Sequence, residues 1–318
     1  MIKIVFFGTP KIALKSLDYL VKSDKIDVVA VVTQPDKPAG RGHKLSLSPI
    51  KQYAVEHGIP VLQPISIKKD LEVQEKLKEI APDFFVTFAF GQILSKEVLA
   101  IPKYSTINLH ASLLPLYRGA NPIQRAIING DKKTGICTMI TEEGLDCGGI
   151  CLRDEIEITQ DMNYVELFEH IAEKSPELIE MTLLSLKGGA MKPVAQCCQS
   201  VTYAHKVKKE ESQIDWNKTA EEIHNLVRGL YKFPSAHCYF KEKFVKIKQT
   251  KVVEGECPQG AQVGEIFELT KEGIKVATLE GVLLIIKVKP EGKAEMFARD
   301  WINGVAGGAK SLVGGKFE

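Results

Sequence analysis

The pattern of hydrophobic and polar residues changes along the chain and divides it into two parts. In the first part, short apolar runs alternate with stretches in which apolar residues recur every three or four positions. The runs are typical of strands buried in a parallel sheet, and the longer period is typical of amphipathic helices. We expect strands at 2–7, 27–33, 61–62, 83–89 and up to His110, and helices at about 12–21, 49–57 and 68–80. This part is therefore predicted to be an α/β domain with a Rossmann-like, mostly parallel sheet.

Beyond residue 206 the period changes to two. Short strands are expected at 236–240, 244–250, 263–269, 273–279 and 282–288. Five short strands within about 110 residues favour a small OB-like β-barrel. Residues 190–205 mix Pro193, small residues and adjacent cysteines, as a linker would. We predict a first domain at 1–189, a linker at 190–205 and a second domain at 206–318.

Composition adds little to this division. The chain has 318 residues, of which 44% are hydrophobic and 26% charged, with a net charge of +2, as is ordinary for a soluble globular protein. No apolar run approaches the ~20 residues of a membrane span, and the first residues are too quickly interrupted for a signal peptide. Seven scattered cysteines without a C-x-x-C pair indicate neither a metal site nor a disulfide framework. We expect a cytoplasmic protein with reduced thiols and no metal.

Two common nucleotide-binding motifs are missing. A dinucleotide site would place G-x-G-x-x-G after the first strand, where Gly8 stands alone, and no Walker A sequence occurs. NAD and ATP are therefore rejected as ligands. Residues 34–49 are expected to form a long loop, which is either a solvated insertion or a functional element.

A stretch of polar residues ends the strand at 110. Asn108 and His110 alternate with apolar neighbours, so they share one face of the strand. Some 36 residues after His110, a glycine-flanked loop carries Asp146. An amide, an imidazole that titrates near neutral pH and a carboxylate can together perform acid–base chemistry. Loops hold such groups more often than their share of residues suggests.

The order and spacing of these motifs resemble those of the folate-dependent formyltransferases. The chain has Asn108-x-His110, then Ser112-Leu-Leu-Pro115, then Gly144-Leu-Asp146-x-Gly148, while residues 118–125 are similar to family members that act on methionyl-tRNA. The resemblance implies the formyltransferase fold followed by a tRNA-binding barrel. It also implies transfer of a formyl group from 10-formyltetrahydrofolate to the α-amine of initiator methionyl-tRNA, without a metal.

The resemblance further implies roles for particular residues. The catalytic residues would be Asn108, His110 and Asp146; the folate would meet Ser112, Leu113, Leu114, Pro115, Phe90, Gly91, Ile93 and Leu94; and the tRNA would meet Arg41, Lys44, Lys246 and Lys248. The asparagine would donate to the developing oxyanion, and the histidine, charged beside the aspartate, would add a second donor. Which of His110 and Asp146 takes the proton of the attacking amine is left open.

Two other functions fit part of the pattern. A formyltransferase for a nucleotide sugar or a glycinamide phosphoribosyl substrate would use the same three catalytic residues. An RNA-binding protein with a relic α/β domain is disfavoured, because the three residues are intact. The part from residue 206 onward has a net charge of only +3, which weakly favours a polyanionic partner. Leu116 stands where the family often has a basic residue, so the role of Arg118 is open. We expect a monomer.

Overall fold

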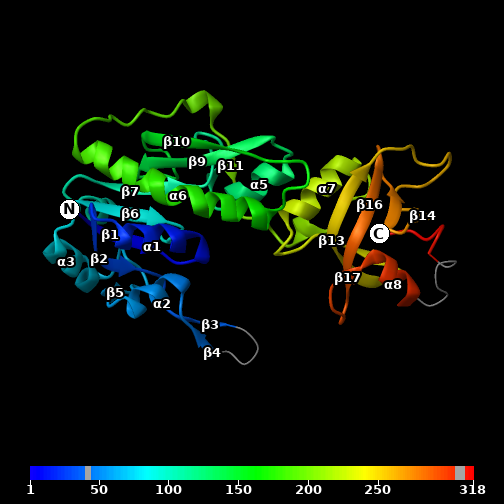
Figure 1. Cartoon of the computed structure of the whole chain (residues 1–318), viewed down its shortest axis with the longest axis horizontal. Coiled ribbons are helices and arrows are strands. Elements are labelled where there is room, and N and C mark those ends of the chain that lie inside the picture. Colours follow the sequence, from blue (N-terminus) through cyan, green and yellow to red (C-terminus); the bar gives the residue numbers. More distant parts are fainter. Residues whose placement is uncertain (40–43, 305–311) are drawn as a thin grey trace. The chain divides into compact units, whose positions relative to one another are not determined.

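The computed structural model describes residues 1–39, 44–304 and 312–318 (Figure 1). It consists of two compact units. Unit 1 comprises residues 1–120, 134–157 and 168–204, and unit 2 comprises residues 121–133, 158–167 and 205–318. The segments at 121–133 and 158–167 thus belong to unit 2, although they precede the expected linker in sequence. The domain boundaries at 189 and 206 stay a prediction.

Unit 1 is built on a seven-stranded sheet of order β10-β9-β7-β6-β1-β2-β5. Its strands are β1 (Ile2–Gly8), β2 (Ile26–Val32), β5 (Val61–Leu62), β6 (Phe84–Phe88), β7 (Ser105–His110), β9 (Lys133–Ile140) and β10 (Ile150–Glu157). Five strands that are neighbours in the sheet pair in parallel, in the order β5, β2, β1, β6 and β7, and β9 pairs antiparallel with β7. The predicted mostly parallel sheet is therefore confirmed.

Helices accompany this sheet. They are a 3₁₀ turn (Lys11–Ala13), α1 (Leu14–Lys22), α2 (Pro49–Glu56), α3 (Leu71–Ile80), α4 (Lys96–Leu99) and α6 (Tyr164–Lys187), with a second 3₁₀ turn at Cys198–Ser200. Asp70 caps the N-terminus of α3, because its carboxylate accepts a hydrogen bond from the Val73 N–H. Phe7 and Phe85 pack with ring centroids 4.8 Å apart in the core between the strands and these helices. This core fixes the strand ends that carry the site.

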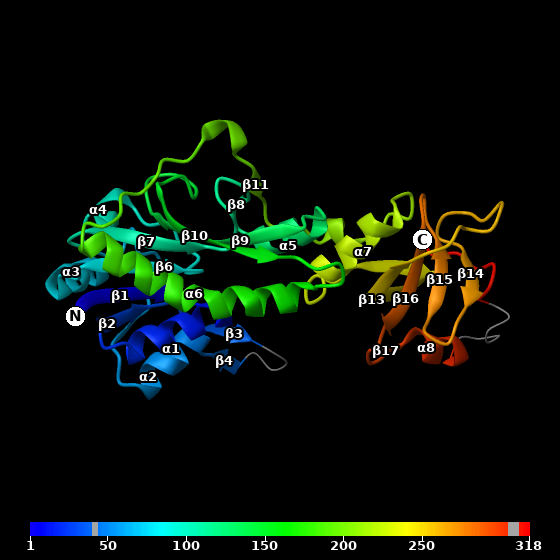
Figure 2. The ribbon, with the colours of Figure 1, turned by 45° about the horizontal axis from the view of Figure 1, so that its top comes forward.

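Four short strands of unit 1 were not predicted. The stretch expected as a loop at 34–49 contains an antiparallel hairpin of β3 (Lys37–Ala39) and β4 (Lys44–Ser46). Its strands are too short to show a period, and Pro38 argues against a strand. The expectation of a structureless loop was therefore wrong. In addition, β8 (Arg118–Gly119) pairs in parallel with β11 (Tyr203–Ala204), as Figure 2 shows.

Unit 2 has an antiparallel sheet of order β12-β13-β16-β15-β14, to which β17 adds beside β16. Its strands are β12 (His237–Phe240), β13 (Lys243–Val253), β14 (Ile266–Leu269), β15 (Ile274–Ala277), β16 (Val282–Pro290) and β17 (Met296–Phe297). Its helices are α5 (Pro122–Ile128), a 3₁₀ turn (Glu210–Ser212), α7 (Ala220–Gly229) and α8 (Ala298–Gly304). The five strands expected from the sequence are all present. The α7 helix begins with a reciprocal capping box between Thr219 and Glu222.

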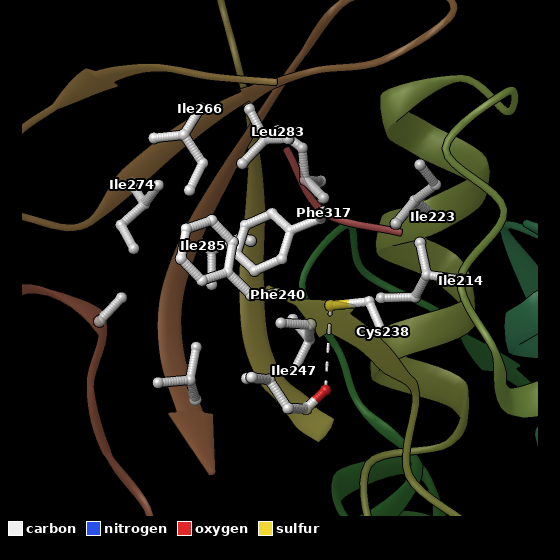
Figure 3. Close-up of a cluster of buried hydrophobic side chains, with 14 of the residues drawn as sticks. Ile214, Ile223, Cys238, Phe240, Ile247, Ile266, Ile274, Leu283, Ile285 and Phe317 are labelled. Atoms are coloured by element: carbon white, nitrogen blue, oxygen red, sulfur yellow. Dashed lines mark hydrogen bonds between the residues drawn. The ribbon is translucent and has the colours of Figure 1, made fainter. Parts of the chain in front are cut away.

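The last residues of the sequence close this sheet. Phe317 bridges Phe240 of β12, and the backbone of Gly315 accepts from the N–H of Ile266 in β14. The segment at 314–318 thus lies between the two edge strands and joins them into a small barrel. Figure 3 shows Phe317 and Phe240 in the barrel interior among side chains from β13–β16. The predicted small, OB-like barrel is confirmed in this form.

Candidate active site

Asn108 lies at the carboxyl end of β7, opposite Thr87 of β6 in the parallel register. The Thr87 hydroxyl donates a hydrogen bond of 2.8 Å to the Asn108 side-chain oxygen. The amide nitrogen of Asn108 therefore keeps both of its hydrogens for another partner. Thr87 was not among the predicted site residues. Only the strand register, which sequence alone does not give, places it beside Asn108.

His110, two residues further along β7, is buried and held at both ring nitrogens. Its Nε2 lies 2.8 Å from the backbone oxygen of Tyr117, and its Nδ1 lies 3.5 Å from Oδ2 of Asp146. A carbonyl oxygen only accepts, so Nε2 carries a hydrogen. Nδ1 is then protonated only in the charged imidazolium.

Asp146 reaches the site from the loop between β9 and β10. Its Oδ2 accepts a hydrogen bond of 2.8 Å from the Gly119 N–H, in addition to facing His110. The backbone of Asp146 has φ 47°, a left-handed conformation that costs about 1–3 kcal/mol for a residue with a side chain. The same loop is packed tightly, because a Cβ on Gly148 would lie 2.0 Å from the Ile140 oxygen. The predicted aspartate and histidine are thus in contact.

The loop after β7 is closed by its own hydrogen bonds. Ser112 is fully buried, and its hydroxyl donates to the backbone oxygen of Leu116 at 2.6 Å. Leu114 is buried in a cluster with Cys137, Met139 and Ile150. Of the predicted folate residues in this loop, Ser112 and Leu114 therefore shape the loop from inside. Leu116 itself is exposed.

The second predicted folate segment, the turn at 89–94, follows β6. The backbone oxygen of Phe90 accepts from the Thr9 hydroxyl at 3.1 Å and from the Gln34 amide at 3.2 Å. Phe90 and Leu94 are buried, whereas Ile93 is 82% exposed and Gly91 has φ 84°. The turn lies at the carboxyl ends of β1 and β6. Ligands of open α/β sheets bind at this edge.

The residues predicted to bind tRNA differ in their exposure and in the contacts that their side chains make. Arg41 lies outside the described residues, and Lys44 begins β4, opposite Ala39. Lys246 is half-buried on β13, in register with Lys289. The Lys248 ammonium donates to the Tyr231 backbone oxygen and to the Ser235 hydroxyl, and it lies 4.8 Å from the Tyr231 ring centroid.

Burial lowers the pKa of Lys248 from its usual value near 10.5, and the charges of Lys246 and Lys289 act in the same direction. Its ammonium is therefore already engaged within the barrel. Lys246 is the more accessible candidate for a polyanion on this strand, since no internal hydrogen bond holds its ammonium in the described part of the chain.

No group of three or more His, Cys, Asp or Glu residues is arranged to hold a metal ion among residues 1–39, 44–304 and 312–318. Within the same residues, none of the helices combines the length and apolar character required to span a bilayer.

A parallel-sheet domain with an amide, an imidazole and a carboxylate at one sheet edge, followed by a small barrel, defines a known class of protein. The chain belongs to the formyl transferase family. The family model described as "Formyl transferase" matches residues 2–183, and that described as "Formyl transferase, C-terminal domain" matches residues 206–306.

The sequence relatives narrow the class. The chain is 47% identical over 304 residues to a protein of Clostridium acetobutylicum named methionyl-tRNA formyltransferase, with 96% of this chain and 97% of that protein covered. It is 43% identical over 302 residues to a protein of the same name from Ruminiclostridium cellulolyticum, with 95% and 96% covered.

Solved structures show the same fold. An N-formyltransferase from Helicobacter canadensis, in complex with folinic acid and dTDP-3-aminofucose, superposes with a TM-score of 0.67 at 22% identity, covering 90% of this chain and 99% of that one. A methionyl-tRNA formyltransferase from Clostridium thermocellum superposes with a TM-score of 0.55 at 18% identity, covering 80% and 96%.

Proposed function

We propose that the chain is a methionyl-tRNA formyltransferase. It transfers the formyl group of 10-formyltetrahydrofolate to the α-amine of methionine on initiator tRNA and so supplies N-formylmethionyl-tRNA for translation initiation. The observation that carries the proposal is the contact of His110 with Asp146 beside Asn108 at the edge of the sheet. The similarity to proteins of that name over 96% of the chain supports the choice of acceptor.

The reaction is an acyl transfer that moves one proton. The methionyl nitrogen forms a bond to the formyl carbon, the bond from that carbon to N10 of the folate breaks, and one proton passes from the methionyl nitrogen to N10. Because the amine lies next to an ester, its basicity is low and the free base is accessible near neutral pH. The tetrahedral intermediate between these steps carries an oxyanion.

Asn108 donates its amide N–H to this oxyanion. The Thr87 hydroxyl holds the amide oxygen, so the NH₂ group is the end presented to the substrate. A donor of this kind is preorganised and remains neutral at all relevant pH values. Removing one such donor in a model enzyme costs about 2.7–4 kcal/mol of transition-state stabilisation.

His110 and Asp146 act as a pair. When protonated, His110 adds positive charge near the oxyanion, while its two N–H groups face the Tyr117 oxygen and the Asp146 carboxylate 3.5 Å away. The pair also moves the proton from the amine toward N10, a task for which positioned acids and bases give about 10²–10⁴-fold. The same carboxylate is fixed by the Gly119 N–H.

The binding residues are proposed as follows. The folate lies against the backbone at 89–94 and the loop at 112–115, with Phe90, Gly91, Ile93, Leu94, Ser112, Leu113, Leu114 and Pro115. The tRNA contacts Arg41, Lys44 and Lys246, whereas the ammonium of Lys248, predicted with them, is held by Tyr231 and Ser235. Residues 1–189 form the catalytic domain and 206–318 the tRNA-binding domain, joined by 190–205. The protein acts as a monomer in the cytoplasm, a reducing compartment that suits its seven free cysteines.

A comparison of acceptors tests the proposal. The protein is incubated with 10-formyltetrahydrofolate and either initiator methionyl-tRNA or a nucleotide sugar with a free amine. Formylation of the methionyl-tRNA alone is expected. An inert methionyl-tRNA together with a formylated sugar would assign the chain to the nucleotide-sugar enzymes of the same fold instead.

A further inference from the structure

Gln196 lies between the loop that carries Asp146 and the loop that follows β7. Its Nε2 donates hydrogen bonds of 2.8 Å to the backbone oxygens of Asp146 and Gly148. Its Oε1 accepts from Nε and Nη2 of Arg118 at 3.1 and 2.8 Å. Arginine only donates and a carbonyl only accepts, so these four contacts determine which end of the amide is the oxygen.

The backbone conformation of the Asp146 loop depends on contacts with residues outside the loop. Asp146 has φ 47°, which is disfavoured for a residue with a Cβ and persists only where the surroundings impose it. Gln196 binds the backbone on both sides of Cys147. It therefore fixes the direction in which the Asp146 side chain leaves the loop.

Arg118 connects this support to the carboxylate itself. The next residue, Gly119, donates its N–H to Oδ2 of Asp146 at 2.8 Å. The Arg118-Gly119 dipeptide forms β8 and is held in place by β11, since the Ala120 N–H donates to the Ala204 oxygen at 2.9 Å. One fixed dipeptide thus restrains Asp146 twice, through Gln196 at its backbone and directly at its side chain.

We propose that Gln196 is a positioning residue for the formyl transfer. Oriented by Arg118, it holds the Asp146 loop in the conformation that places the carboxylate beside His110. The proposal rests on the proposed function for the task of Asp146, whereas the restraint on the loop is independent of the substrate. Because Gln196 acts through Asp146, its loss reduces kcat and leaves the KM for the folate nearly unchanged.

The first test replaces Gln196 by leucine, which keeps the size and removes all four hydrogen bonds. We expect kcat to fall by about 10- to 100-fold, as a small misplacement of a catalytic group does, with KM within about twofold. Gln196→Glu, which keeps an acceptor for Arg118 but loses both donated bonds, is expected to be similarly impaired. Gln199→Leu, the same change at an exposed position three residues away, is expected to behave as wild type.

A double-mutant cycle then separates positioning from general damage. In an Asp146→Asn background, Gln196→Leu is expected to cause little further loss, because residues that act as a unit are not additive. If the two losses simply multiply, Gln196 does not act through Asp146 and the proposal is overturned.

A second measurement does not depend on activity. Hydrogen exchange of the Gly119 amide reports its bond to the Asp146 carboxylate, and exchange at Ala120 reports the β8–β11 pairing. In Gln196→Leu we expect faster exchange at Gly119 and unchanged exchange at Ala120. Unchanged exchange at Gly119, or equal loss at both amides, would overturn the proposal. A wild-type protein that formylates no methionyl-tRNA, while Gly119 alone loses protection in the variant, would refute the proposed function and support the positioning.

Discussion

Replacing Asp146 by asparagine removes a negative charge at nearly constant volume. Oδ2 of Asp146 accepts from the Gly119 N–H at 2.8 Å and lies 3.5 Å from Nδ1 of His110. The asparagine oxygen can keep the first contact. A neutral amide, however, cannot stabilise a proton on Nδ1. The variant therefore removes the electrostatic contribution and leaves the loop contacts largely in place.

The size of the effect follows from the position of the carboxylate at the reacting centre. Losing one preorganised electrostatic group at such a centre costs about 2.7–4 kcal/mol of transition-state stabilisation. The Asp146 side chain is only 19% exposed. At about 1.4 kcal/mol per factor of ten, kcat is expected to fall by about 10²–10³-fold. This lies within the range for a positioned acid or base.

Single-turnover formylation of initiator methionyl-tRNA measures this loss without interference from product release. The melting temperature is expected to change little, because the Gly119 contact is retained. Glu143→Gln is a matched control, since it removes a charge from an exposed residue of the same loop and should leave kcat unchanged. An Asp146→Asn protein that keeps more than about a tenth of the wild-type kcat would refute the reasoning, since a tenth corresponds to only about 1.4 kcal/mol.

Three further variants test other parts of the structure. Thr87→Val removes the hydroxyl that holds the Asn108 amide and should lower kcat by about 3- to 10-fold. The buried hydroxyl of Thr106 has no partner among the described residues, so Thr106→Val should leave kcat unchanged. Single-turnover rates of the two variants measure the difference. Phe317→Ala should lower the free energy of unfolding of the barrel by about 3–5 kcal/mol, whereas Val313→Ala, at an exposed position, should have little effect. Urea denaturation monitored by tryptophan fluorescence measures this, since both tryptophans lie in that core. Burial lowers the pKa of the His224 imidazole below its usual value near 6.5. The imidazole is therefore protonated more readily in the unfolded chain, and the free energy of unfolding of the barrel should fall as the pH drops below about 6.5. A His224→Gln protein with the same pH dependence as the wild type would contradict this.

The fold could be predicted because its signals are local. The buried runs at β1, β2 and β6 appear as continuous apolar sequence, and the barrel strands appear as alternation, as at β13, where Val245 and Ile247 are buried. The hairpin at β3 and β4 was missed because three-residue strands show no period. The closing segment at 314–318 was missed for a different reason. Its pairing with β12 and β14 joins residues far apart in the chain, and its own sequence is rich in glycine.

Part of the site could be predicted from residue types. Asn108 and His110 share a strand face by period alone, and the glycine-flanked Asp146 was recognised by resemblance. Gln196 was not recognised, because it contacts Asp146 across 50 positions of sequence in a stretch that reads as a linker. Thr87 was not recognised because its contact depends on the register of two parallel strands. The sequence therefore predicts the catalytic side chains, but not the residues that orient them.

The backbone at 117–119 explains why a motif beside the catalytic residues is so informative. The Tyr117 oxygen receives the Nε2 hydrogen of His110, and the Gly119 N–H binds the Asp146 carboxylate. One tripeptide therefore presents an acceptor to the imidazole and a donor to the carboxylate. This requires unusual backbone angles, φ 59° at Tyr117 and φ 116° at Gly119, and a Cβ on Gly119 would lie 3.0 Å from the Ala204 oxygen. Only glycine meets both conditions at 119 without strain, so the glycine in this motif is required by the orientation of the catalytic pair.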